Sequence, residues 1–125
     1  MISISPIKIN LDFTKIEIYE DYLVSTVNEG VLFDTPELEQ YNSIIDTYFQ
    51  GKIFGFISNR VNDYTINPTS IMKTSNNYGL LGVAVLCYTK SSFDNSLFVK
   101  KFYSKPYKAF YTLEECKQWF DSLRK

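Results

Sequence analysis

The sequence predicts an α/β domain built on a mixed sheet, in which an N-terminal antiparallel meander is followed by βα units with helices packed on the sheet. Three observations support this prediction. Apolar and polar residues alternate near the N-terminus, as in half-buried strands. Helix-like and strand-like segments alternate from residue 34 onward, which favours parallel strands joined by right-handed crossovers. The 125 residues are 45% hydrophobic, so we expect one domain over residues 1–125 with its own core.

The N-terminal meander is predicted from side-chain alternation. Residues 7–13 alternate apolar with polar side chains, and residues 16–18 continue the pattern in a second short strand. Residues 20–21 supply a turn, and residues 22–27 form a third strand rich in β-forming residues. We expect these strands to be antiparallel and to end in a turn with positive φ at Gly30.

Two helices are predicted in the middle of the chain. Asp34 or Thr35 can cap the first helix, and Gly51 ends it. Its apolar residues recur at helical spacing and are expected to face inward: Leu38, Tyr41, Ile44, Ile45, Tyr48 and Phe49. Asn67 is expected to cap a weaker helix over residues 68–76.

Two further helices are predicted near the C-terminus. Ser91 can cap the first of them, which ends before Pro106. One broad side of it is expected to be apolar, with Phe93, Leu97, Phe98 and Phe102. Thr112 and Glu115 have the spacing of a capping box that opens the last helix. Its expected inward residues are Leu113, Cys116, Trp119, Phe120 and Leu123.

Three strands are predicted between these helices. Residues 53–58 form a short apolar run typical of a buried central strand. Residues 80–88 are apolar almost throughout, as expected of a strand covered on both faces, and Gly82 and Ala84 allow a helix to approach closely. Residues 107–111 are expected to form a short strand at an edge of the sheet.

The polar loop after the central strand is the predicted functional surface. In an open α/β sheet, ligands and partners dock at the carboxyl ends of central strands. The guanidinium of Arg60 can hold a carboxylate or phosphate in a bidentate fork. Alternatively, Arg60 pairs with Glu29 or Asp63 and joins two loops. Tyr64 is either an exposed anchor for a partner or packs over the loop. The predicted partner-binding residues are Glu29, Ser58, Asn59, Arg60, Asn62, Asp63, Tyr64, Thr65 and Asn67.

The charges are unevenly distributed along the chain. Residues 1–50 contain nine acidic and two basic residues, and residues 51–125 contain five acidic and eleven basic residues. The two halves either neutralise each other in one sheet or leave a bipolar surface that favours self-association or a charged partner. A pI of about 5.4 argues against nucleic-acid binding. A lysine cluster is interpreted as a solvated helix end, or alternatively as a contact for an anionic membrane or an acidic patch: Lys100, Lys101, Lys105 and Lys108.

The sequence predicts that the protein is not an enzyme. It contains no histidine, the usual general base and metal ligand. Its two cysteines make no zinc site, and it contains none of the glycine-rich phosphate-binding motifs. Glu29 and Asp63 are the one plausible acid pair, and nothing in the sequence brings them together. We therefore expect no catalytic residues, no metal and no cofactor.

The expected location is the cytoplasm. The N-terminus lacks a basic-then-apolar signal, and no apolar run approaches about 18 residues, so stable membrane insertion is not expected. Cys87 falls in a strand-like run and Cys116 on a helix face, where both are expected to be small core residues in a reducing compartment.

Four stretches resemble a known family: YLVSTVNEG at 22–30, FISNRVNDYTINP at 56–68, the apolar strand at 80–85, and the aromatic strand leading into a helix at 105–119. Together with the element order, they resemble the STAS-like fold of sulfate transporter and anti-sigma-factor antagonist domains. The chain is similar in particular to small stand-alone bacterial members described as STAS or SEC14-like. The resemblance implies a non-enzymatic regulator that docks on a protein partner.

The sequence departs from that family at its phosphorylation motif. The best-known members are switched at a Ser or Thr in an Asp-Ser pair that starts the helix after the central strand. Here the residues after Ile57 are Ser58, Asn59 and Arg60, with no Asp-Ser pair. The resemblance therefore carries over the fold and the docking surface alone.

The expected function is docking of a protein partner of unknown identity through the loop after the central strand. The alternative is a small-molecule or lipid-binding module, suggested by the SEC14-like description and the many aromatic residues. That alternative requires an apolar cavity of about several hundred Å³. Homodimerisation through the meander or the aromatic edge strand also stays open.

Overall fold

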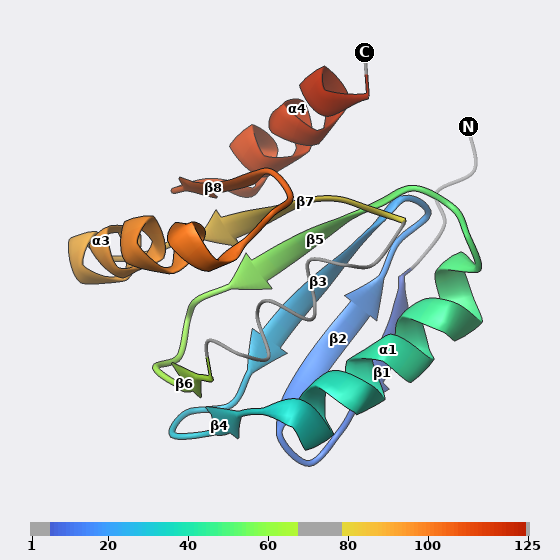
Figure 1. The fold of residues 1–125 in the computed structure, drawn as a ribbon, viewed down its shortest axis with the longest axis horizontal. Helices are drawn as coiled ribbons and strands as arrows, with labels where there is room; N and C mark the ends of the chain where they lie inside the picture. The colour runs from blue at the N-terminus through green and yellow to red at the C-terminus, as the bar shows by residue number, and fades with distance from the viewer. Residues whose placement is uncertain (1–5, 68–78, 125) are drawn as a thin grey trace.

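The structure, a computed structural model, describes residues 6–67 and 79–124 (Figure 1). Six strands form one sheet in the order β1-β2-β3-β5-β7-β8. Pairs β1–β2 and β2–β3 are antiparallel, and pairs β3–β5, β5–β7 and β7–β8 are parallel. The predicted mixed α/β sheet, with an antiparallel meander followed by βα units, is confirmed.

The meander follows the predicted pattern of strands. It consists of β1 (Ile7–Asn10), β2 (Thr14–Ile18) and β3 (Tyr22–Val27). The Tyr19 N–H donates to the Tyr22 carbonyl at 2.9 Å, which places the predicted turn at residues 20–21. The first strand ends at Asn10 rather than at residue 13, because the Leu11 N–H donates to the Thr14 carbonyl and closes the hairpin there.

The central position of β5 (Phe54–Asn59) is confirmed, because β3 and β7 pair with it on either side. Ile53 was expected inside this buried strand, and that expectation is wrong. Its side chain is 61% exposed. Pairing begins one residue later, where the Phe54 N–H donates to the Gly79 carbonyl.

The first helix, α1 (Thr35–Phe49), begins and ends as predicted. Of the two candidates, Asp34 caps it, in a capping box with Glu37. Gly51 follows its end with a φ of 83°. Its buried residues include Leu38, Tyr41, Ile45 and Phe49, whereas Tyr48 is on the exposed side and not inward as expected.

After β7 (Leu80–Leu86), helix α3 (Lys90–Val99) differs from its prediction in start and orientation. Thr89, not Ser91, caps it, since the Thr89 hydroxyl accepts from the Ser92 N–H. Ser96 and Val99 are its buried residues. Leu97 and Phe98, expected to line the apolar side, therefore point to solvent. A short 3-10 helix, η1 (Lys100–Phe102), follows.

The last strand, β8 (Tyr107–Phe110), forms an edge of the sheet as predicted, and α4 (Leu113–Leu123) follows it. Thr112 caps α4 as predicted, because its hydroxyl accepts from the Glu115 N–H at 3.2 Å. The Glu115 carboxylate accepts from the Thr112 hydroxyl at 3.0 Å and not from its backbone N–H, so the second bond of the predicted capping box differs. Leu113 was expected to face inward but is 42% exposed, because the sheet contact begins one turn later with Cys116.

Two apolar cores cover the two faces of the sheet. One is formed with α1 and α3 and includes Tyr41, Val83 and Tyr107. The other is formed with α4 and includes Ile57 and Phe120. Figure 1 shows α1 and α4 on opposite sides of the sheet. The small residue expected to let a helix approach does so at Gly82, where an added Cβ would lie 3.2 Å from Trp119.

A second, two-stranded sheet was not predicted. It consists of β4 (Leu32–Phe33) and β6 (Thr65–Ile66), which pair in parallel. Thr65 was expected in a loop, but its N–H donates to the Val31 carbonyl at 2.9 Å. The helix predicted over residues 68–76 lies outside the described residues.

Cys87 and Cys116 are free and buried, as expected. Across residues 6–67 and 79–124, no helix has the length and apolar character needed to cross a membrane.

Candidate functional site

The loop that follows β5 is fixed to its neighbours by backbone hydrogen bonds. The Arg60 N–H donates to the Leu86 carbonyl at 2.9 Å, which ties the loop to the end of β7. The Gly30 N–H donates to the Asp63 carbonyl at 2.8 Å, which ties it to the loop after β3. Gly30 has the predicted positive φ, at 77°. The two loops are therefore held side by side at one end of the sheet.

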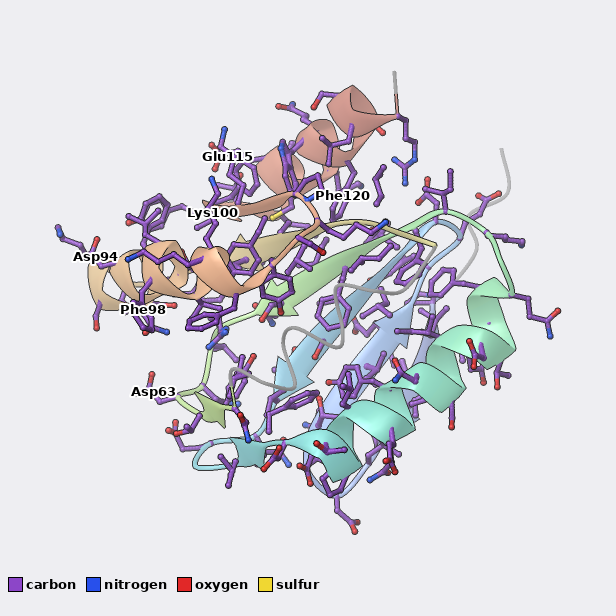
Figure 2. All side chains as sticks on the ribbon, in the orientation of Figure 1. Asp63, Asp94, Phe98, Lys100, Glu115 and Phe120 are labelled. Carbon is purple, nitrogen blue, oxygen red and sulfur yellow. The ribbon has the colours of Figure 1, made fainter. Side chains whose placement is uncertain are left out.

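Glu29 and Asp63 lie at this junction of the two loops, and neither forms an ion pair with Arg60. The Glu29 carboxylate accepts from the Asp63 N–H at 3.2 Å. Asn62 adds a bond from its Nδ2 to the Val27 carbonyl at 3.1 Å. No ion pair in the described part of the chain includes Arg60, so the alternative in which Arg60 pairs with one of these acids is wrong. Figure 2 shows Asp63 beside β6, pointing away from the sheet.

Asn59 connects three strands at the same end of the sheet. Its Nδ2 donates to the Thr26 hydroxyl at 3.1 Å, and its Oδ1 accepts from the Tyr88 hydroxyl at 2.6 Å. Thr26 is in β3, and Tyr88 is the second residue after the end of β7. The side chain therefore acts as a polar link across the carboxyl ends of β3, β5 and β7.

Thr65 and Asn67, at the far end of the loop, belong to the small sheet. The Asn67 N–H donates to the Phe33 carbonyl at 2.9 Å, and its Nδ2 donates to the Asp34 carboxylate at 3.0 Å. These contacts hold β6 against the start of α1. The structure thus separates the predicted site residues: Glu29, Asn62 and Asp63 join the two loops, Asn59 links the strand ends, and Thr65 and Asn67 lie near α1.

The three remaining predicted residues, Ser58, Arg60 and Tyr64, contact one another. The Arg60 Nε donates to the buried Ser58 hydroxyl at 3.1 Å, and that hydroxyl also shares a bond of 3.2 Å with the Tyr64 hydroxyl. The Arg60 guanidinium lies 4.4 Å from the centre of the Tyr64 ring, within cation–π range. Tyr64 is half-buried. Of the two positions considered for this side chain, the structure shows the one packed over the loop.

These three side chains line a cavity of about 40 Å³ on the face of the sheet that α1 covers. Its other polar lining residues among those described are Ser25, Tyr41, Asn42, Tyr103 and Tyr107. Cavities that hold drug-sized ligands span about 300–1,000 Å³. This cavity is much smaller than the one that the lipid-binding alternative requires.

The hydroxyls of Tyr41, Tyr103 and Tyr107 have raised pKa values and are protonated at neutral pH. Burial raises the pKa of Tyr41, and hydrogen bonds with Ser25 and Thr14, at 2.5 and 2.7 Å, oppose part of that increase. Burial also raises the pKa of Tyr103 and Tyr107, while the Arg60 charge lowers both. Arg60 therefore acts electrostatically on the interior of the cavity.

Three exposed apolar side chains at this end of the sheet were missed by the sequence analysis. Val61, Tyr88 and Tyr111 are 57%, 54% and 50% exposed. Each follows the carboxyl end of one of three adjacent parallel strands, β5, β7 and β8. We call these three residues the apolar rim. Their signal in the sequence was a large apolar residue just past each strand, but Tyr88 and Tyr111 were counted as part of the strands.

Within residues 6–67 and 79–124, no three side chains of the metal-ligating types come together as a metal site. The polar groups around Arg60 instead provide hydrogen-bond donors and one positive charge. Such an arrangement is suited to contact with an anionic or polar group.

The comparisons with known proteins identify the fold. No protein-family model matches the chain, and no curated protein matches it. The structure is similar to that of an uncharacterized protein of the DUF3478 family with a SpoIIAA-like fold, from Shewanella loihica PV-4. The TM-score is 0.62 at 14% sequence identity, and the match covers 96% of this chain and 98% of the other. The chain has the SpoIIAA-like, or STAS, fold, as its sequence resemblance implied.

Proposed function

We propose that this protein is a non-enzymatic regulatory domain that docks a protein partner at the carboxyl ends of β5, β7 and β8. The observation that carries the proposal is the apolar rim, in which each of three neighbouring strands is followed by an exposed apolar residue. Exposed apolar side chains that gather in one place, with polar residues around them, are typical of protein–protein contacts.

The fold supports the same proposal. The SpoIIAA-like fold is typical of regulatory domains of the anti-sigma antagonist type. In an open α/β sheet the carboxyl ends of the strands are also the usual docking edge. The fold and the apolar rim are independent supports, because the fold is a likeness of the whole chain and the rim is a property of three side chains.

The residues of the rim have different roles in this proposal. Tyr88 and Tyr111 supply rigid aromatic area, which is enriched at the centres of interfaces. The hydrogen bond from Tyr88 to Asn59 fixes one of these rings before binding. Glu29 and Asp63, which are exposed at the margin, supply charge that orients the partner.

Affinity purification from the native host with matched variants tests the proposal. Val61→Lys places a charge in the rim without removing a hydrogen bond. Leu97→Lys, on α3, is the control, because Leu97 is 54% exposed and Val61 is 57% exposed. We expect proteins recovered with the wild type to be recovered with Leu97→Lys and to be lost, by about tenfold or more, with Val61→Lys, as a charge in an apolar interface costs more than about 1.4 kcal/mol.

Equal recovery of every protein with the two variants would refute the rim as the docking surface. Light scattering of the purified protein at low and high salt identifies the case in which the partner is a second copy of this chain. Screening by salt would weaken self-association that depends on the opposite charges of the two halves.

A further inference from the structure

The cavity beneath Arg60 contains a buried hydroxyl with no hydrogen-bond partner. Tyr107 is 5% exposed, and its hydroxyl is the one buried side-chain polar atom in the described residues that makes no hydrogen bond. Leaving a hydroxyl buried and unpaired costs about 1–3 kcal/mol. Native proteins contain few such groups, and each one needs an explanation.

The same cavity is lined by a guanidinium that has no acidic counterpart. Arg60 is half-buried, and no carboxylate of residues 6–67 or 79–124 lies within ion-pair distance of it. Its Nε donates a hydrogen bond to the Ser58 hydroxyl, and its planar face lies over the Tyr64 ring. The guanidinium lowers the pKa of Tyr107 through its charge and as a hydrogen-bond donor beside the Tyr107 hydroxyl. Because a guanidinium accepts no hydrogen bond, the Tyr107 O–H still has no acceptor. A partly desolvated cation of this kind is stabilised by an anion placed beside it.

The size of the cavity restricts the anion. Its volume of about 40 Å³ is far below the roughly 300 Å³ at which drug-sized sites begin, so the anion is small. A phosphate is larger than a carboxylate and carries close to two negative charges at neutral pH, whereas Arg60 is the one cationic side chain in the lining among the described residues.

The remaining lining suits the rest of a small organic acid. Phe33, Phe56 and Val83 contribute apolar surface to the cavity. The Tyr107 hydroxyl can donate to one carboxylate oxygen, and the planar fork of Arg60 matches the geometry of a carboxylate. The charge, the unpaired donor and the volume therefore indicate the same chemical group.

We propose that the cavity between α1 and β8 binds one carboxylate group, with Arg60 as its counter-ion and Tyr107 as a hydrogen-bond donor. The carboxylate belongs to a small free acid of the size of acetate. The same chemistry would accept the acidic side chain of a bound partner, and the two sources are separable by experiment.

The test is a titration of the full-length, ¹⁵N-labelled protein followed by NMR. Sodium acetate is the probe for a free acid, and N-acetyl-glutamate amide is the probe for a partner's side chain. Sodium phosphate and sodium chloride at equal ionic strength are the comparison salts. We expect saturable shifts of the Arg60 signals with acetate, and no saturable shifts with either comparison salt.

Three variants locate the binding. Arg60→Gln removes the counter-ion and is expected to weaken acetate binding at least tenfold. Tyr107→Phe removes only the unpaired hydroxyl, so the protein should stay as stable as the wild type or gain stability, while acetate binds several-fold more weakly. Arg124→Gln makes the same change in net charge at a surface ion pair with Asp21 and Asp121 and should bind acetate like the wild type.

Shifts with acetate that do not saturate, or that persist in Arg60→Gln, would overturn the proposal, as would tighter saturable binding of phosphate. Tighter binding of N-acetyl-glutamate amide than of acetate, with the same dependence on Arg60, would overturn the free acid as the ligand. The outcome is independent of the docking proposal, because Val61→Lys changes the rim and is expected to leave acetate binding unchanged.

Discussion

The guanidinium of Arg60 lies 4.4 Å from the centre of the Tyr64 ring, and the hydroxyls of Tyr64 and Ser58 are 3.2 Å apart. Because the Arg60 Nε also donates to Ser58, the three side chains form one unit. Tyr64 thus positions the Arg60 guanidinium at the cavity, and the guanidinium in turn covers the Tyr64 ring. The stability of the loop and the position of the charge therefore depend on the same contacts.

Two substitutions of Tyr64 separate its ring from its hydroxyl. Tyr64→Phe keeps the ring beneath Arg60 and loses the contact with Ser58, so it should lower the free energy of unfolding by about 1 kcal/mol. Tyr64→Leu also loses the cation–π contact and should cost about 0.5–1 kcal/mol more. Urea unfolding measures both. In an Arg60→Gln background, the extra cost of Tyr64→Leu over Tyr64→Phe should disappear, because the cation–π contact is already lost. If the losses from the substitutions at Arg60 and Tyr64 simply add, the contact does not stabilise the protein.

Gly55 is predicted to be intolerant of any side chain. A Cβ at this position would lie 2.5 Å from the ring of Phe120, which is 1% exposed and lies between α4 and the sheet (Figure 2). Gly55→Ala should therefore destabilise the protein by about 1–3 kcal/mol, seen as a lower Tm.

The matched test of this prediction replaces the ring. Phe120→Leu alone should be destabilising, because it leaves a cavity in the core beneath α4. In the double variant Gly55→Ala/Phe120→Leu the added methyl group occupies part of that cavity, so the loss should be smaller than the sum of the two single losses. A double variant whose loss equals or exceeds that sum would show that the close approach is not what limits residue 55.

We expect the protein to lose stability at alkaline pH because its two thiols are buried. Burial raises the pKa of Cys116 to about 12 from its ordinary value of 9.0, and it also raises the pKa of Cys87. The unfolded chain releases these protons from about pH 9 upward, while the folded chain retains the Cys116 proton until about pH 12. The contribution of the protonated Cys116 thiol to the free energy of unfolding is therefore complete below pH 9. It is lost as the pH rises toward 12.

Two measurements check this prediction. At pH 8 neither thiol of the folded protein should react with a thiol reagent within the time in which both react in denaturant, because both are buried. Between pH 9 and 10.5 the free energy of unfolding of Cys116→Ala should fall less steeply than that of the wild type. Rapid reaction of the folded protein, or equal pH slopes, would contradict it.

Local patterns were sufficient for much of the fold. The cap of α4 at Thr112, the turn at residues 20–21 and the apolar run that forms β5 depend on residues close to one another in the chain. Patterns of this kind indicate where an element begins and which elements alternate. They failed on α3, where Leu97 and Phe98 have helical apolar spacing but lie on the solvent side. Which side of a helix is covered depends on what the sheet presents to it.

The amino-acid sequence by itself determined the order of the strands of the six-stranded sheet, the mixed character of that sheet and the loop in which Arg60 lies. The tertiary structure alone decided what surrounds that arginine. Tyr107 is far from Arg60 in the chain and reaches the same cavity because β8 joins the sheet beside β7. The physical reason is that secondary structure follows from local backbone and side-chain preferences, whereas an unpaired hydroxyl or charge is a property of all the groups that packing brings around it.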